Sequence, residues 1–405
     1  MLRSLTYCLI ALVALSVACS RPSNSPEVPP EVLTLADSLR QAFAPDQRTA
    51  LFQPEFRQSP DHILITGLTT IPTARQALID NLRAQGYSIQ DSLRLLPDTN
   101  QLGDQTWGLV NLSVCNIRSS PTHSAELSTQ ATLGTPLRIY EKQNDWYRVQ
   151  TPDGYFGWLD DGGFTLLTEA EWMSWKQKKR VIYLPDMGFA LENPAANARR
   201  VSDLLAGNIL VDIHRRDEFT QVQFPDGRLA WIPTHEVLDF SAWLDTRAPT
   251  PDNILATAAD HLGRPYLWGG TSGKAMDCSG FTKTVFYLNG LLLPRDASQQ
   301  VHVGRTVPTD TTWRNLQPGD LLFFGRPATD QQPEKITHVA IYQGDGRIIH
   351  ASERVREQSL RPGDPDFAPE RLKTFIRAKR VLDTQSEQYA IPISDLSAYQ
   401  VAPPS

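Results

Sequence analysis

Residues 276–286 read Met-Asp-Cys-Ser-Gly-Phe-Thr-Lys-Thr-Val-Phe, a cysteine followed by apolar residues at helical spacing. These apolar residues fall on one face of a helix that we expect to end at Asn289-Gly290. Cys278 then lies at the start of that helix, where unpaired backbone N–H groups and the helix dipole favour a thiolate. The position predicts a nucleophile, and the alternative is an inert thiol.

A nucleophilic thiol needs a base, and a predicted hairpin supplies one. Two apolar segments, each containing a histidine, flank Gly344-Asp345-Gly346. A turn centred on Asp345 would place His350 opposite position 340, one diagonal step from His338 on the same face. Side chains related in this way lie within reach of each other. We interpret His338 as the base and His350 as the residue that orients it, a Cys-His-His form of the catalytic triad.

An internal repeat precedes this region. Residues 149–158 recur without gaps as residues 222–231, with six of ten positions identical. The shared Pro-Asp-Gly is typical of a hairpin, because Pro fixes φ and Gly accepts a positive φ. Two copies of this size predict two small β-barrels rather than a solenoid. We interpret Trp158 and Trp231 as packing residues of these barrels rather than as ligand-stacking residues.

The region before the repeat predicts a small α/β unit over residues 35–107. Its expected elements are strands at 50–56 and 63–68, a helix at 72–85 that begins with Pro and is capped by Gly86, and a strand at 87–95. None of its side chains forms a recognisable chemical constellation. We therefore expect a packing or positioning role for this unit.

The N-terminus is typical of a targeting signal. Arg3 precedes an apolar run over residues 9–17, which is too short to span a bilayer comfortably, and Ala18-Cys19 follows. A small residue before a cysteine resembles the lipobox of bacterial lipoproteins, although Ser16 stands where Leu is usual. The resemblance implies removal of residues 1–18, a lipid on Cys19 and a membrane-anchored, exported protein. The alternative is an ordinary signal peptide; the Pro-rich residues 19–34 predict a tether.

Composition excludes several classes of protein. The chain of 405 residues carries a net charge of −6 and is 40% hydrophobic, which is typical of a folded protein and offers no basic cluster for nucleic acid. Outside the predicted signal and Cys19, only Cys115 and Cys278 remain, too few for a disulfide framework or a thiolate zinc site. No phosphate-loop, dinucleotide or His-Glu-x-x-His motif is present. We expect no metal or other cofactor, and a monomer.

The C-terminal motifs together resemble the NlpC/P60 family of cysteine peptidases, which have a compact papain-like fold. The matching motifs are Tyr-x-Trp-Gly-Gly at 266–270, Asp-Cys-Ser-Gly at 277–280, Pro-Gly-Asp-Leu at 318–321, His338-Val339 and the second histidine, His350. The repeated barrels resemble bacterial SH3 (SH3b) domains, especially Asn116-Ile117-Arg118 in the first copy. The predicted fold is therefore a multidomain α+β protein. Its segments are a signal (1–18), a tether (19–34), the α/β unit (35–107), two SH3b domains (108–168 and 169–245), the peptidase domain (250–383) and a tail (384–405).

This layout resembles the γ-D-glutamyl-L-diamino acid endopeptidases of murein peptide recycling. The resemblance implies cleavage of L-Ala-γ-D-Glu-diamino acid peptides, with diaminopimelate or lysine as the diamino acid and a free N-terminal L-Ala. It also implies that Cys278 attacks the γ-amide carbonyl, that His338 moves the proton and that His350 holds His338. The backbone N–H of Cys278 and the ring of Tyr266 would stabilise the oxyanion.

The resemblance also implies a substrate-binding set. Arg295-Asp296 matches the family's Arg-Asp pair, in which the Asp meets the substrate's ammonium group, although residue 297 is Ala where some relatives have Ser. Glu126 and Tyr155 of the first barrel would close the same amine pocket. The residues flanking the nucleophile, Asp277 and Ser279, complete the expected set.

Two other functions remain open at this point. An N-acetylmuramoyl-L-alanine amidase or an acyltransferase on a related scaffold could use the same cysteine and histidines, and it would tolerate a blocked N-terminus. A non-enzymatic lipoprotein could bind peptidoglycan through its barrels and carry an inert C-terminal domain. The pair Arg295-Asp296 favours the peptidase over both.

Overall fold

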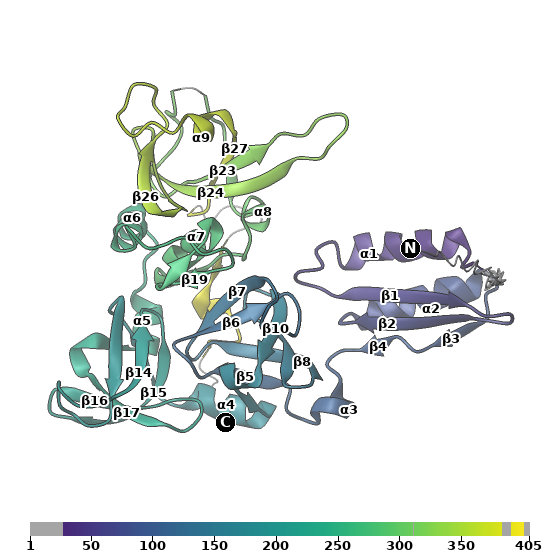
Figure 1. Cartoon of the computed structure of the whole chain (residues 1–405), viewed down its shortest axis with the longest axis horizontal. Helices are drawn as coiled ribbons and strands as arrows, with labels where there is room; N and C mark the ends of the chain where they lie inside the picture. The colour runs from purple at the N-terminus through teal and green to yellow at the C-terminus, as the bar shows by residue number, and fades with distance from the viewer. Residues whose placement is uncertain (1–26, 311, 383–389, 401–405) are drawn as a thin grey trace, which may run out of the picture.

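The computed structural model describes residues 27–310, 312–382 and 390–400 of the chain. The predicted lipid site, Cys19, and the first part of the predicted tether lie outside these residues. Four units follow one another: Figure 1 shows the N-terminal unit on the right, a barrel in the centre, and a second seven-stranded unit and the C-terminal domain on the left. Within the described ranges, no helix is long and apolar enough to cross a membrane.

The N-terminal unit is a small sheet packed against two helices. Its elements are α1 (Pro30–Phe43), β1 (Phe52–Gln58), β2 (Ile63–Thr69), α2 (Pro72–Ala84), β3 (Ile89–Asp91) and β4 (Arg94–Leu95). Strand β2 pairs with β1 antiparallel and with β3 and β4 parallel. Apolar residues of both helices, among them Val32 and Leu78, pack on Phe52 and Ile65 of the sheet in one buried cluster.

Two expectations for this unit need correction. The tether was predicted to extend to residue 34, but helix α1 already begins at Pro30, where a proline fits the first helical turn. Val32 and Ala36 lie four residues apart and are the buried residues of α1. This apolar pattern is too short to predict a helix directly after a segment that contains four prolines. The strand predicted at 87–95 is two short strands, β3 and β4.

The two repeat copies have the same strand order. The first consists of β5 (Trp107–Val110), β6 (Val114–Arg118), β7 (Leu127–Thr132), β8 (Pro136–Gln143), β9 (Trp146–Gln150), β10 (Phe156–Asp160) and β11 (Phe164–Leu167), in the order β11-β5-β8-β9-β10-β6-β7. The second consists of β12 (Arg180–Tyr183), β13 (Met187–Leu191), β14 (Arg200–Leu205), β15 (Ile209–Arg216), β16 (Phe219–Gln223), β17 (Leu229–Pro233) and β18 (Val237–Asp239), in the order β18-β12-β15-β16-β17-β13-β14. Matched strand by strand, the two orders are identical. The Pro-Asp-Gly turns join β9 to β10 and β16 to β17, as predicted.

Short helices connect these units. Helix α3 (Thr99–Leu102) leads into the first barrel, α4 (Glu169–Gln177) joins the first barrel to the second seven-stranded unit, and α5 (Phe240–Thr246) precedes the C-terminal domain. Near the other end of the chain, β28 (Ile391–Pro392) pairs with β21 (Leu291–Leu292). Tyr399 is buried with Trp243 in an apolar cluster that joins α5 to the C-terminal segment.

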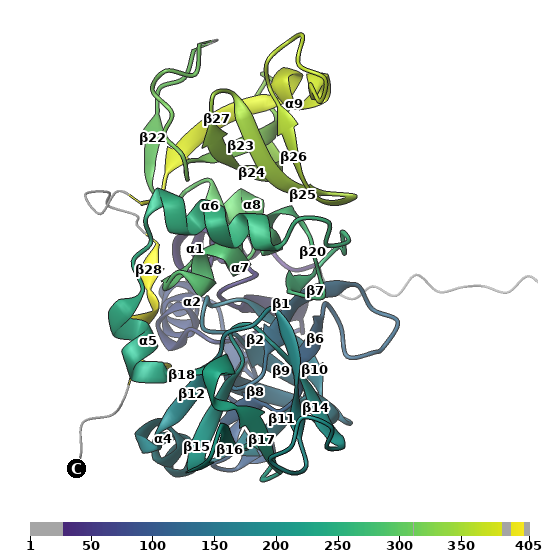
Figure 2. The same ribbon diagram turned by 90° about the vertical axis from the view of Figure 1, so that its left-hand side faces the viewer.

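The C-terminal domain packs helices on a six-stranded sheet (Figure 2). Its helices are α6 (Pro251–Asp260), α7 (Cys278–Leu288), α8 (Ala297–Gln300) and α9 (Pro369–Lys373), and β19 (Thr271–Ser272) and β20 (Ala275–Met276) form a small ribbon before α7. The sheet order is β22 (Arg305–Val307), β27 (Phe375–Arg380), β23 (Leu321–Arg326), β24 (Lys335–Gly344), β25 (Arg347–Ser352) and β26 (Arg354–Ser359). Helix α7 packs its apolar face on β24 and β25, so the predicted helix is confirmed. Ile341 pairs with Ile349, which confirms the predicted hairpin register.

Two equivalent glycines of the repeat lie where units meet. Gly134 and Gly207 are related by the repeat offset, and each has a positive φ, +79° and +88°. A Cβ on Gly134 would lie 2.3 Å from the backbone oxygen of Ile209 in the second unit, and one on Gly207 would lie 2.9 Å from the Tyr287 ring on α7. The missing side chain therefore permits close contact between units at both positions.

We expect Gly134→Ala to lower the free energy of unfolding by about 2–4 kcal/mol, because it adds a backbone clash to the cost of a positive φ. Gly227→Ala is the matched control, since Gly227 has a φ of +89° but no atom within 4 Å of a new Cβ. The control should cost only about 1–2 kcal/mol. Urea unfolding followed by tryptophan fluorescence measures both, and equal losses would contradict the role of close contact.

Candidate active site

The nucleophile candidate Cys278 is the first residue of α7. Asp277 caps the helix, since its Oδ1 accepts a hydrogen bond of 2.7 Å from the backbone N–H of Gly280. A side chain at position 280 would meet the backbone oxygen of Gly270 at 2.0 Å, so the glycine lets the helix start lie directly against the preceding loop. Cys278 is 6% exposed, and neither it nor the buried Cys115 forms a disulfide.

Two buried histidines form a chain of hydrogen bonds on the sheet beneath α7. His338 Nε2 lies 2.6 Å from His350 Nδ1, and His350 Nε2 lies 2.9 Å from Gln358 Oε1 on β26. An amide oxygen only accepts, so His350 carries its proton on Nε2 and accepts at Nδ1 from His338 Nε2–H. This arrangement leaves Nδ1 of His338 unprotonated and able to act as a base. The predicted His338–His350 pairing is confirmed, and Gln358 is an additional member.

The start of a helix predicts a lowered thiol pKa for Cys278, and this prediction is wrong. Burial and the adjacent Asp277 carboxylate raise the pKa of Cys278 to about 11, although the backbone N–H groups of Val339 and Ser279 partly oppose this rise. Burial also lowers the pKa of His338 well below its ordinary value, and that of His350 to about 4. At neutral pH both catalytic candidates are therefore uncharged. The start of a helix does not outweigh the loss of water and a carboxylate one residue away.

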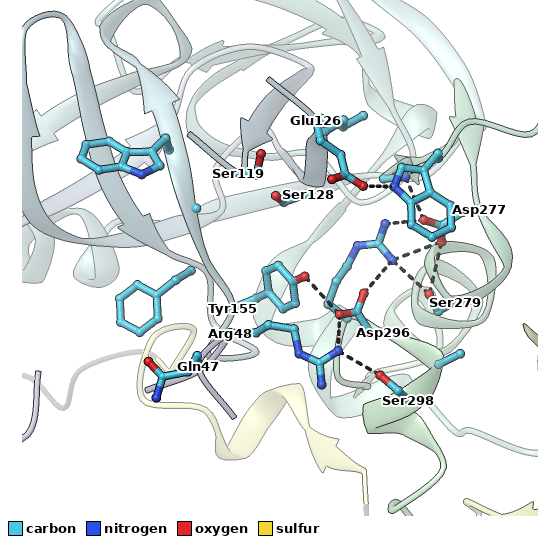
Figure 3. Close-up of a pocket in the computed structure, with 18 of the residues that line it drawn as sticks. Gln47, Arg48, Ser119, Glu126, Ser128, Tyr155, Asp277, Ser279, Asp296 and Ser298 are labelled. Carbon is cyan, nitrogen blue, oxygen red and sulfur yellow. Dashed lines mark hydrogen bonds and ion pairs between the residues drawn. The ribbon is translucent and has the colours of Figure 1, made fainter. Parts of the chain in front are cut away.

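A cavity of about 660 Å³ opens in front of Cys278, and three units line it. The N-terminal unit contributes Gln47 and Arg48 among others, and the first barrel contributes Tyr155 and Trp158 among others. The C-terminal domain contributes the remaining residues, including Asp277 and Asp296 (Figure 3). Trp158 is buried, as expected of a packing residue, but it also forms part of this wall.

A buried ion pair fixes the cavity floor. Arg295, 1% exposed, donates to both carboxylate oxygens of Asp277 at 2.6 and 3.1 Å and to the Ser279 hydroxyl at 3.0 Å. Asp277 Oδ2 also accepts from the backbone N–H of Gly269 at 2.9 Å. Asp277 and Ser279 line the cavity as predicted, but their polar atoms bond to the protein itself. The geometry gives them the task of holding Arg295 and the start of α7.

Asp296 presents a carboxylate to the same cavity and is 28% exposed at its side chain. Its Oδ2 accepts from the Tyr155 hydroxyl at 3.1 Å and from Arg48 Nη1 at 2.7 Å, whereas its Oδ1 lies 4.0 Å from Arg295 Nη1. Burial and the charge of Asp296 raise the pKa of Tyr155, which keeps this hydroxyl protonated as a donor. The structure thus brings the predicted pair Tyr155–Asp296 together from two units.

The other two predicted residues lie near the site in different ways. Glu126 lines the cavity, but its Oε1 accepts from the indole N–H of Trp268 at 2.6 Å rather than facing Asp296. Tyr266 packs against the apolar core around Cys278. Burial and then the charge of Cys278 raise the pKa of Tyr266, so its hydroxyl remains a donor beside the nucleophile.

Four residues of the site were missed by the sequence analysis: Arg48, Trp268, Gln358 and Arg371. The position of Gln358 could have been inferred from strand pairing. Arg356 on β26 pairs with His350 on β25, and Gln358, two residues after Arg356, lies on the same face of the sheet. The charge of Arg371 acts on Cys278 and on His350, where it favours a thiolate and disfavours an imidazolium. Arg48 had no local signal.

The described side chains include no group of three or more His, Cys, Asp or Glu placed to hold a metal ion. The site offers a buried thiol at the start of α7, a neutral imidazole on the adjacent strand β24, and the Tyr266 hydroxyl as a donor packed on the same core. The Asp296 carboxylate lies in the same cavity as the thiol. This set can perform acyl transfer through a thioester. The fold and the site define a cysteine hydrolase.

Comparison with known proteins identifies the family. The model of the NlpC/P60 family matches residues 263–366, and the model described as bacterial dipeptidyl-peptidase Sh3 domain matches residues 117–163. The chain therefore contains an NlpC/P60 cysteine-peptidase domain and, in its first barrel, a bacterial SH3 domain. These matches confirm the NlpC/P60 domain and one bacterial SH3 domain that the sequence motifs predicted.

Relatives extend the similarity over most of the chain. A Bacillus cereus protein named gamma-D-glutamyl-L-lysine dipeptidyl-peptidase is 29% identical over 318 residues, which cover 76% of this chain and 91% of the relative. A Bacillus subtilis protein of the same name is 28% identical over 238 residues, which cover 56% of this chain and 72% of the relative. The crystal structure of an NlpC/P60 family protein from Bacillus cereus aligns with a TM-score of 0.57 and 26% identity, covering 68% of this chain and all of the other.

The lowered histidine pKa values predict an unusual pH profile. Protonation of His338 removes the base, and a lowered pKa keeps this residue neutral to a lower pH. We expect kcat/KM for a cleaved peptide to hold its value on acidification to a pH below the ordinary histidine pKa of about 6.5. Circular dichroism over the same range separates ionisation from unfolding. A midpoint at or above 6.5 would indicate a resting thiolate–imidazolium pair instead.

Proposed function

We propose that the protein hydrolyses the bond between γ-D-Glu and the diamino acid in short murein peptides that carry a free N-terminal L-Ala. The observation that carries this proposal is the carboxylate of Asp296 in the same cavity as the Cys278 thiol. The names of the Bacillus cereus and Bacillus subtilis relatives support a γ-D-glutamyl bond as the target. The cavity volume of about 660 Å³ suits a small peptide rather than a polymer strand.

The reaction would proceed through a thioester. Nδ1 of His338 takes the thiol proton as Cys278 Sγ attacks the γ-carbonyl carbon, and the backbone N–H of Cys278 and the Tyr266 hydroxyl stabilise the oxyanion. The C–N bond then breaks, and His338 gives its proton to the departing amino group of the diamino acid. Water, deprotonated by His338, cleaves the thioester and releases L-Ala-D-Glu together with the free thiol. Throughout, His350 holds His338, and Gln358 holds His350.

The amine requirement would follow from charge. A peptide with a free N-terminus brings an ammonium group to Asp296, whereas an N-acylated peptide leaves this partly buried carboxylate without a new counter-ion and must fit extra atoms against the wall. A site built around such a charge discriminates strongly against ligands that lack the partner. Peptides still attached to glycan through their N-terminal residue would be rejected for the same reason.

The test is mass spectrometry of L-Ala-γ-D-Glu-diaminopimelate and L-Ala-γ-D-Glu-L-Lys after incubation with soluble protein that begins at Ser20. We expect release of L-Ala-D-Glu from the free peptides, at least ~100-fold slower release from N-acetylated copies, and none with Cys278→Ala.

Other outcomes would favour other functions. Equal cleavage of free and acetylated peptides would contradict the amine requirement and support a hydrolase that acts on intact wall. No cleavage by folded protein, together with retention on insoluble peptidoglycan, would support a binding lipoprotein.

We further propose that the protein is an exported lipoprotein with its lipid on Cys19 and that the second seven-stranded unit is a second SH3b domain. The Ala18-Cys19 pair after an apolar run supports the first proposal, and the repeat with its identical strand order supports the second. Such a protein would act on wall peptides at the cell envelope.

Expression with a radiolabelled fatty acid should label the wild-type chain. The Cys19→Ser variant should remain unlabelled, while Cys8→Ser should label normally because Cys8 lies within the predicted signal. Equal labelling of the Cys19→Ser and wild-type chains would contradict lipidation at Cys19.

A further inference from the structure

The N-terminal unit reaches the peptidase cavity through the loop between α1 and β1. Within this loop, the backbone oxygen of Arg48 accepts from the N–H of Phe156 at 2.8 Å, and that of Thr49 accepts from Gln150 Nε2 at 3.1 Å. Leu51 at the end of the loop packs with Phe156 in a buried apolar cluster. Backbone bonds and apolar packing therefore dock the loop firmly on the first barrel.

The docked loop places a charged pair against Asp296. Arg48 forms a two-pronged ion pair with Asp46, with both N···O distances 2.8 Å. Its Nη1 also donates to Asp296 Oδ2 at 2.7 Å and to the Ser298 hydroxyl at 2.9 Å (Figure 3). Gln299 Nε2 closes the arrangement by donating to Asp46 Oδ2 at 2.7 Å. The N-terminal unit and the peptidase domain thus share one hydrogen-bonded network.

The charges of this network explain how Asp296 can hold a cation although an arginine touches it. Arg48 is matched by Asp46, and Arg295 is matched by Asp277, each through two hydrogen bonds. Two arginines against three carboxylates leave one negative charge, which belongs to Asp296. Arg48 and Tyr155 both donate to Oδ2, whereas the nearest charged group to Oδ1 is Arg295 Nη1 at 4.0 Å, so Oδ1 is the oxygen that side chains of the protein engage less.

We propose that Arg48 is a positioning residue for peptide recognition: the Asp46–Arg48 pair of the N-terminal unit holds Asp296 so that Oδ1 faces the substrate's ammonium group. This inference rests on the proposed function. It gives the N-terminal unit a part in specificity, because it completes the wall of the cavity beyond the amine end of the peptide. Further residues added before L-Ala would meet this wall.

A competing interpretation makes Arg48 a plug that imitates the ammonium group and must leave before the peptide binds. Two features favour positioning over a plug. Arg48 has its own counter-ion in Asp46, so leaving Asp296 is not required for neutrality, and its loop is fixed by Phe156 and Gln150 rather than free to withdraw. The two interpretations predict opposite changes in KM.

The experiment measures kcat and KM for free L-Ala-γ-D-Glu-diaminopimelate, and kcat/KM for its N-acetylated copy, with full-length soluble wild-type, Arg48→Ala and Arg48→Lys proteins. The matched control is Arg75→Ala. Arg75 lies in the same unit, forms a similar ion pair with Asp91 at 2.7 Å and has a similarly exposed side chain, 36% against 39%, but it lies outside the cavity.

We expect Arg48→Ala to raise KM about tenfold for the free peptide with kcat changed less than about threefold, and to reduce the preference for free over acetylated peptide by about the same factor. Arg48→Lys keeps the positive charge but loses the two-pronged guanidinium geometry, so its KM should lie between those of the wild type and Arg48→Ala. This variant also supplies the KM comparison if the alanine variant folds poorly. Arg75→Ala should match the wild type.

Three results would overturn the proposal. An unchanged KM and an unchanged preference for the free peptide in both Arg48 variants would show that Asp296 needs no support from Arg48. A lower KM would show that Arg48 blocks the site and must leave before the peptide binds. An equal effect of Arg75→Ala would show that the change is merely structural. Failure of the proposed function can be distinguished from failure of this inference, because the wild-type protein would then cleave neither peptide or would cleave the free and the acetylated peptide equally.

Discussion

The buried ion pair between Arg295 and Asp277 is the interaction on which the rest of the site depends. Asp277 caps α7 and so fixes Cys278, while Arg295 precedes Asp296 and so fixes the carboxylate at the other side of the cavity. Loss of either partner would leave a buried charge without compensation, which typically costs about 3–5 kcal/mol. One pair therefore links the position of the nucleophile to the position of the recognition group.

The site is assembled from three units, and the repeat shows how two similar units came to differ. Tyr155 on the first copy donates to Asp296, whereas the equivalent Arg228 on the second copy donates to the backbone oxygen of Asn111 in the first. In the first copy this position serves the cavity, and in the second copy it serves the contact between the two copies. The N-terminal unit adds Arg48, so residues far apart in the chain enclose a single small cavity.

Local patterns predicted the catalytic centre well. The helix after Cys278 and the pairing of His338 with His350 follow from spacing within a helix and a hairpin, and both were confirmed. The network around Arg48 could not be predicted, because it depends on how a separate unit docks. The thiol pKa was predicted in the wrong direction, because the helix dipole can be read from a sequence but the burial of the thiol, which has the largest effect on its pKa, cannot.

The central claim is that one cavity holds the peptide by its ammonium group while presenting its γ-amide to Cys278. The most direct measurement is a crystal structure of the Cys278→Ala variant with L-Ala-γ-D-Glu-diaminopimelate. The account predicts the peptide's terminal nitrogen within hydrogen-bond distance of Asp296 Oδ1, and the γ-carbonyl over residue 278 beside Tyr266. A peptide bound in the reverse direction, or with its ammonium group in solvent, would contradict it.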